Sequence, residues 1–176
     1  LHAINYSYHS QIMTTKTTQS NGAADANAPH IEPNVYLKDV SYEAPNGPLI
    51  SEQTVTPNVT MDVQTTINQL GPQMYEVIVG VNVRSVLNEK TLWLCEVKQA
   101  GSFILRNIAA AEVQRLLSVF CPNYLWPYAR QTISDLLVKG GFAPFLLPPV
   151  NFEALYEQTL AQQELLNTPA ANTTVN

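Results

Sequence analysis

Two successive segments in which apolar and polar residues alternate constrain the fold most strongly. Residues 58–72 read NVTMDVQTTINQLGP, and residues 74–88 read MYEVIVGVNVRSVLN. Side chains of a β-strand point alternately to the two faces of a sheet, so each segment is predicted to be a strand with one apolar face. The connection through Gly71 and Pro72 is short, and short connections between strands favour an antiparallel hairpin.

Two further strand-like segments flank this pair. Residues 34–48, NVYLKDVSYEAPNGP, form a β-prone run that ends in a Pro-Asn-Gly-Pro turn. Residues 91–105, TLWLCEVKQAGSFIL, follow the pair after a short turn. We therefore predict that residues 35–105 form a four-stranded antiparallel sheet.

The hydrophobic period changes to that of helices after Asn107. Pro122 is expected to stop or kink a first helix, and a second helix is expected to resume near residues 123–127 and to end at Gly140. The i, i+3, i+4, i+7 spacing of the first helix is carried by Val113, Leu116, Leu117 and Phe120.

The C-terminal part continues with a connector and a last helix. Residues 142–150, FAPFLLPPV, hold three prolines and are predicted to be an extended apolar connector. Asn151 is expected to cap the last helix. Because the strands come first and the helices follow, we predict a single-domain α+β fold with the helices on one side of the sheet.

Both ends of the chain lack a hydrophobic period. We expect residues 1–33 to be a disordered N-terminal arm, residues 34–163 the folded domain, and residues 164–176 a disordered tail. Residues 1–12 precede Met13 and are set apart as a stretch that need not be native.

The low charge content limits the classes of partner and compartment. Charged residues make up 13% of the chain and the formal net charge is -5, which argues against nucleic acid as the main partner and favours basic partners. No apolar run is long enough to span a membrane, and the N-terminal residues lack a secretory signal pattern. Cys95 and Cys121 form no CxxC pair and are expected to be reduced, buried thiols.

The residues offer little for catalysis. His2, His9 and His30 all lie in the expected arm, which argues against histidine-based catalysis and most zinc sites. The sequence has no Gly-rich phosphate-binding motif. We therefore expect that the protein is not an enzyme and that it binds no metal and no cofactor. A carboxylate enzyme built on Asp39 and Glu43, which share one strand face, is a less favoured alternative.

The predicted sheet carries an excess of negative charge. Over residues 34–100, seven acids stand against four bases, a net charge of -3. Such a sheet face can dock a basic partner or can simply be solvated, and the residues by themselves leave both interpretations open.

Apolar residues are dense around the second helix start and the connector. Either they pack the helices on the sheet and form a subunit contact, or they line an open apolar groove. In the second interpretation, the proline-broken helix start and the connector together form a rigid trough for an unfolded chain. The residues concerned are Trp126, Phe142, Phe145, Leu146, Leu147, Phe152 and Tyr156.

Three stretches of the sequence resemble one family of proteins. They read VYLKDVSYEAPNGP, LCEVKQAGSF and FCPNYLWPYARQTISDLLVKGGFAPFLLPPVNFEALYEQ, and the likeness covers about residues 34–163. These stretches are similar to SecB, the bacterial protein-export chaperone. The resemblance implies a cytoplasmic homotetramer, built as a dimer of dimers, that holds unfolded preproteins without ATP and passes them to the ATPase SecA.

The resemblance also implies roles for individual residues. SecA docking falls on the positions of Asp39, Glu43, Leu94 and Glu96. Client binding falls on the positions of Val59, Met61, Val63, Tyr156 and Leu160. The trough interpretation adds Trp126, Phe145 and Phe152 to the client-binding residues.

The ends of the chain depart from the family pattern, because the arm is long and the tail is short of charge. A related variant of the family serves toxin–antitoxin systems, and that role is an alternative. Another alternative is an interaction scaffold that recognises one folded basic partner through the acidic sheet face. Binding of several unrelated unfolded proteins would distinguish a chaperone from such a scaffold.

Overall fold

The computed structural model describes residues 28–48 and 56–167, and its central element is one antiparallel sheet. The sheet has four strands in the order β1-β4-β3-β2, so β1 and β2 are its edges. The predicted four-stranded sheet and the α+β class are confirmed. The strands are β1 (His30–Glu43), β2 (Asn58–Gly71), β3 (Met74–Leu87) and β4 (Lys90–Arg106).

Strand β1 begins earlier than the sequence pattern predicted. His30 pairs with Arg106 at the end of the long strand β4, so residues 30–33 belong to the sheet and not to the arm. The pattern missed them because Pro33 and Asn34 interrupt the β-prone run, whereas pairing with β4 depends on a strand far along the chain. His2 and His9, which were also expected to lie in the arm, are outside the described residues.

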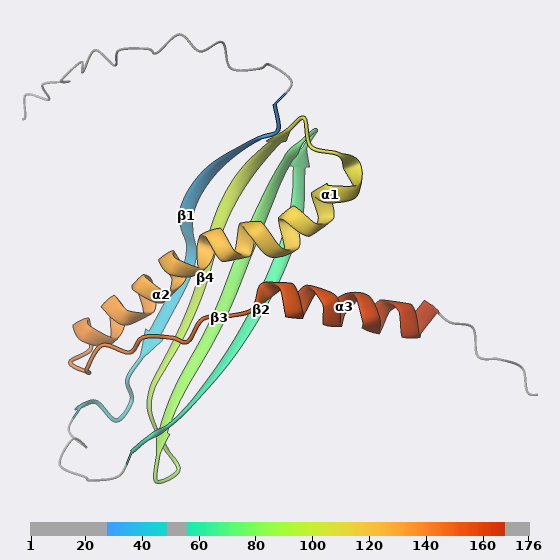
Figure 1. The fold of residues 1–176 in the computed structure, drawn as a ribbon. Coiled ribbons are helices and arrows are strands. Elements are labelled where there is room, and N and C mark those ends of the chain that lie inside the picture. Colours follow the sequence, from blue (N-terminus) through green and yellow to red (C-terminus); the bar gives the residue numbers. More distant parts are fainter. Residues whose placement is uncertain (1–27, 49–55, 168–176) are drawn as a thin grey trace, which may run out of the picture.

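All helices lie on one face of the sheet, as predicted (Figure 1). Three segments follow one another without a gap: α1 (Ala110–Arg115), the π-helical turn η2 (Leu116–Phe120) and α2 (Cys121–Lys139). The last helix, α3 (Phe152–Asn167), starts near β2 and extends beyond that edge of the sheet (Figure 1). It therefore continues past residue 163, where the tail was expected to begin.

The helix does not break at Pro122, contrary to the sequence-based expectation. The turn before the proline widens instead, and the backbone N–H of Cys121 donates to the carbonyl of Leu116, five residues back. A π turn changes the hydrogen-bond pattern where the proline has no N–H to donate, so the ring fits into a continuous helix. As predicted, the helix ends at Gly140.

The core forms between this long helix and strands β3 and β4. Gly101 permits the close approach, because a Cβ atom there would lie 2.9 Å from the Phe103 ring and 3.0 Å from Leu125. Cys95 and Cys121 are buried free thiols, as predicted, and burial raises their pKa values to about 11 and about 12. The helix side of this core consists mainly of Leu117, Cys121, Leu125, Ala129, Ile133 and Leu137.

Among the helices in the described part of the chain, none is both long and apolar enough to cross a membrane.

Candidate functional site

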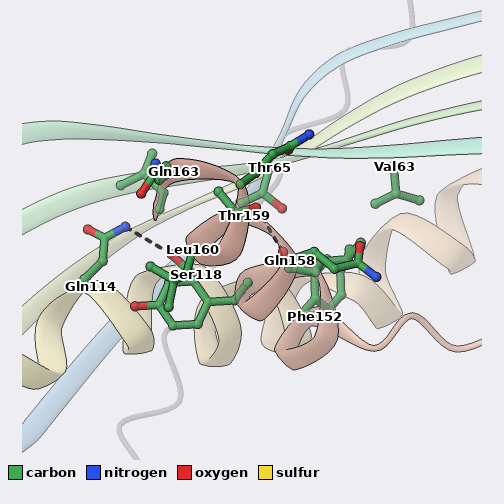
Figure 2. A pocket seen from close by; sticks show the side chains of 13 residues that line it. Val63, Thr65, Gln114, Ser118, Phe152, Gln158, Thr159, Leu160 and Gln163 are labelled. Atoms are coloured by element: carbon green, nitrogen blue, oxygen red, sulfur yellow. Dashed lines mark hydrogen bonds between the residues drawn. The ribbon is translucent and has the colours of Figure 1, made fainter. Parts of the chain in front are cut away.

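An open groove of about 660 Å³ lies between β2 and α3 on the helix side of the sheet (Figure 2). Strand β2 forms one wall, α3 forms the other, and α1 and η2 contribute polar side chains between them. The lining residues are Val63, Thr65, Ile67, Gln114, Ser118, Phe152, Leu155, Tyr156, Gln158, Thr159, Leu160, Gln162 and Gln163.

The groove exists because α2 does not cover β2, and it is mainly the short η2 segment of the long helix that contacts this strand. Helix α2 packs on β4 and β3, and the apolar row of β3 is buried beneath it. On β2 the apolar row is only partly covered: Val63 is half-buried and Met61 is 36% exposed. The partner of Met61 across the strands, Val83, is 0% exposed.

The chemistry of the groove is apolar and amide-rich. None of the side chains that the structure places in its lining is charged. Gln114 donates to the Ser118 hydroxyl, and Thr159 donates to the Leu155 carbonyl, so some polar groups are held in place by the helices. Apolar surface with scattered amides and hydroxyls suits an extended peptide, which offers both side chains and unpaired backbone groups.

Four of the predicted client-binding residues lie together in this groove: Val63, Phe152, Tyr156 and Leu160. Val59 and Met61 are not part of its lining. They continue the same row of β2 on the same face, because side chains two residues apart on a strand point the same way.

Trp126 does not line the trough that was predicted from the helix start and the connector. Trp126 is buried in the core and meets Phe152 edge-on at a centroid distance of 6.0 Å. Phe145 is half-buried against Trp93, at 6.1 Å between the ring centroids. Trp126 is therefore a core residue. Phe145 is only half-buried and its neighbour Leu146 is 73% exposed, so a role of Phe145 in client binding stays a prediction. Phe152, at 1% exposure, contributes only to the groove floor.

The polar residues of the lining were not among the client-binding residues predicted from the sequence. Thr65 and Ile67 share the apolar face of the alternating segment and could have been added from that pattern. Gln158, Gln162 and Gln163 belong to a glutamine-rich helix whose facing partner only the structure reveals.

The four predicted docking residues lie on the other face of the sheet, close together. Glu43 pairs with Leu94, and the neighbouring position on β4 with the same orientation is Glu96, which pairs with Ser41. Asp39 follows on β1. We call Asp39, Glu43, Leu94 and Glu96 the docking face. Its position opposite the helices separates it from the groove by the thickness of the sheet.

Cations lie on the same face as the docking residues, among them Lys98, and Arg84 of β3, which pairs with Leu94. Lys98 Nζ lies 2.9 Å from the Asp39 carboxylate, and both side chains are more than half exposed. The hydrogen bond from Lys98 lowers the pKa of Asp39. Glu43 and Glu96 take part in none of the ion pairs found among the described residues, and Lys98 interacts with Glu96 only at longer range.

An aromatic row follows the outer side of the long helix. Phe120, Tyr124 and Tyr128 are 43%, 38% and 46% exposed, and successive ring centroids are 6.2 Å apart. The aromatic residues of the sequence CPNYLWPYAR thus divide into two sets: Trp126 fills the core, and Tyr124 and Tyr128 face outward.

Comparisons with known proteins agree with this architecture. Residues 24–163 match the family model described as "Preprotein translocase subunit SecB". A "Protein-export protein SecB" of Chromobacterium violaceum is 46% identical over 129 residues, which cover 73% of this chain and 86% of the relative. That of Stenotrophomonas maltophilia is 43% identical, with coverages of 74% and 76%.

A solved structure has the same fold. The SecB-like chaperone of Mycobacterium tuberculosis, in complex with a ChAD peptide from an antitoxin, superposes with a TM-score of 0.55 at 14% identity. The match covers 69% of this chain and 90% of that chain. The family model, the relatives and the fold lead to one conclusion: this chain belongs to the SecB family.

Proposed function

We propose that this protein is an ATP-independent holdase of protein export, which keeps preproteins unfolded in the cytoplasm. The observation that carries the proposal is the open, uncharged groove between β2 and α3. An unfolded chain has no fixed shape, so its recognition depends on apolar burial and on backbone contacts. Each client side chain buried against residues such as Val63 and Leu160 gains about 1.5–3 kcal/mol.

The groove of one chain is short, so we propose that it acts within a homotetramer, a dimer of dimers. The exposed row of Phe120, Tyr124 and Tyr128 supports self-association through the helix side, because soluble monomers rarely expose contiguous aromatic surface. Several grooves on one particle then bind one long client with avidity. Light scattering tests this: a particle of roughly four times the 19.5 kDa chain mass is expected, and a monomer would contradict it.

We further propose that the docking face binds SecA. The support is its excess of carboxylates, which complements a basic partner. Because the docking face and the groove lie on opposite faces of the sheet, SecA can engage while a client is still bound.

Aggregation of an unfolded secretory precursor, measured by light scattering without ATP, tests the holdase function. The protein is expected to suppress aggregation near stoichiometric ratio and to do so for several unrelated unfolded proteins. Suppression limited to one protein would favour an interaction scaffold. No suppression at excess chaperone would refute the holdase.

A further inference from the structure

A polar cluster around one buried carboxylate lies on the face of the sheet opposite the described helices. Glu76 of β3 is only 6% exposed. Its carboxylate accepts hydrogen bonds from Lys38 Nζ, at 2.7 and 2.8 Å, from Asn68 Nδ2 at 2.9 Å, and from the Tyr36 hydroxyl. One carboxylate therefore joins residues of β1, β2 and β3.

The side chains from β1 reach Glu76 by crossing the intervening strand β4. At that level β4 carries small residues: Ala100 is the pairing partner of Tyr36, and Ser102 is the pairing partner of Glu76. The hydrogen bonds lower the pKa of Glu76 to about 2, so the carboxylate is charged at neutral pH and its ion pair with Lys38 is complete.

The same lysine is the sequence neighbour of a docking residue. The register of β1 shifts between Leu37 and Asp39, so Lys38 is an extra residue in a β-bulge. As a result, Lys38 and Asp39 both project from the face opposite the described helices, one toward Glu76 and the other toward Lys98. Without Glu76, the flexible Lys38 ammonium could turn back toward the carboxylates of the docking face.

We propose that Glu76 is a positioning residue for the docking face: it holds Lys38 over β4, away from Asp39, and so keeps that face negative. The inference rests on the proposed docking of SecA. It differs from a purely structural role, because it predicts that the effect of losing Glu76 is cancelled when the Lys38 charge is also removed.

The test compares Glu76→Gln with the double variant Lys38→Met/Glu76→Gln by SecA binding, measured calorimetrically at low salt with the full-length protein. Glu76→Gln keeps the shape of the side chain but leaves Lys38 unpaired, and SecA affinity is expected to fall about three- to tenfold, the size expected for one misplaced charge. The double variant is expected to return to within about twofold of the wild type. At about 1 M ionic strength, where the Debye length is about 3 Å, the difference should vanish.

Two results would overturn the inference: unchanged affinity in Glu76→Gln, or a double variant that binds as weakly as the single one. The second result would mean that the cluster shapes the sheet and does not position a charge. Should Glu76→Gln fail to fold, the double variant decides by itself, since it leaves no unpaired lysine beside position 76. Wild-type affinity then supports the inference and weakened affinity refutes it.

A control separates this inference from the proposed docking. If Asp39→Ala/Glu43→Ala leaves SecA binding unchanged, the docking face is wrong and this inference falls with it. If that variant weakens binding while Glu76→Gln does not, docking stands and only the role of Glu76 is refuted. Suppression of client aggregation, which uses the opposite face, is expected to be unchanged in all these variants.

Discussion

Strands β2 and β3 are paired and carry the same alternating pattern, but the apolar side chains of β3 are buried and those of β2 are half-buried or exposed. On β3 the row of Val77, Val79, Val81 and Val83 is at most 1% exposed. On β2 the directly opposed positions are open or half-buried, as Val63 and Met61 illustrate. The difference arises from what lies above them, since α2 packs on β3 and β4 while β2 faces a groove.

This comparison separates two meanings of an apolar strand face. Alternation reports which side of the sheet a residue occupies, but it does not report whether another element covers that side. An uncovered apolar row costs solvation free energy in the isolated chain, and a client that covers it recovers that free energy. The same chemistry therefore stabilises the fold on β3 and is available for binding on β2.

The largest predicted effect comes from a charge placed in the buried apolar row of β3. Val81→Asp would bury an unpaired carboxylate beneath the helix, at a cost of about 3–5 kcal/mol or more, which is comparable to the stability of a typical domain. We expect loss of the cooperative thermal transition by circular dichroism. Asn82→Asp, its exposed neighbour on the other face, is the matched control and should melt like the wild type. A cooperative melt of Val81→Asp near the wild-type temperature would contradict the conclusion that the apolar row of β3 is structural.

The second effect is acid sensitivity of the Glu76 cluster, which joins β1, β2 and β3 on the face opposite the helices. The pKa of Glu76 is lowered from 4.5 to about 2, chiefly by the hydrogen bond from Lys38. Because the folded value lies below the unfolded one, this stabilisation is fully present above about pH 5 and is lost as the pH falls toward 2. Because the Lys38 side chain is 39% exposed and water screens the ion pair, the stabilisation is about 1–2 kcal/mol. Urea unfolding between pH 6 and 3 should show a steeper loss of stability in the wild type than in Glu76→Gln, and equal slopes would contradict the prediction.

The third effect comes from a charge placed either in the partly exposed apolar row of β2 or on α3, the helix that faces this row. Met61 is 36% exposed and Leu160 is 40% exposed, so Met61→Asp or Leu160→Asp should leave the melt within a few degrees of the wild type. Client affinity should fall about tenfold, since one apolar contact of about 1.5 kcal/mol is replaced by a charge that must be desolvated. The readout is binding of an unfolded precursor.

Thr60→Asp is the matched control for the groove variants, because Thr60 lies on β2 but pairs with Arg84 on the opposite face. It should bind clients normally. If Thr60→Asp and Met61→Asp weaken client binding equally, net charge and not the uncovered row is responsible.

The smallest effect concerns the docking face. Asp39→Ala/Glu43→Ala should weaken SecA binding about fivefold at low salt, the scale of exposed charge interactions, with client holding unchanged. The deficit should shrink as salt is added. Normal SecA binding together with impaired client holding would reverse the assignment of the two faces.

Much of the fold was predictable because its signals are local. The alternation in residues 58–72 and 74–88 predicted the hairpin of β2 and β3, and Gly140 predicted the end of the long helix. Asp39 and Glu43 were also predicted to share a strand face, whereas the pairing of Glu43 with Leu94 of β4 is visible only in the structure. Strand periodicity and short turns determine such features within a few residues of each other.

The burial of individual aromatic residues in the predicted trough was not predictable, as Trp126 and Phe145 illustrate. A dense run of aromatic residues has the same sequence signature whether it fills a core or lines a groove. The choice depends on the connector, which carries Phe145 against Trp93 and brings Phe152 to Trp126. The uninterrupted helix at Pro122 was not predictable either, because the widened turn before the proline leaves no mark in the hydrophobic period.

The sequence by itself determined which side of each strand is apolar, where strands give way to helices, and that the chain resembles the SecB family. Only the tertiary structure decided which apolar side is covered, which aromatic residues are withdrawn from solvent, and that Lys38 is held by Glu76 across an intervening strand. The physical reason is that periodicity is set by the local geometry of the backbone. Coverage and long-range ion pairs depend on the free energy of packing between segments far apart in the chain.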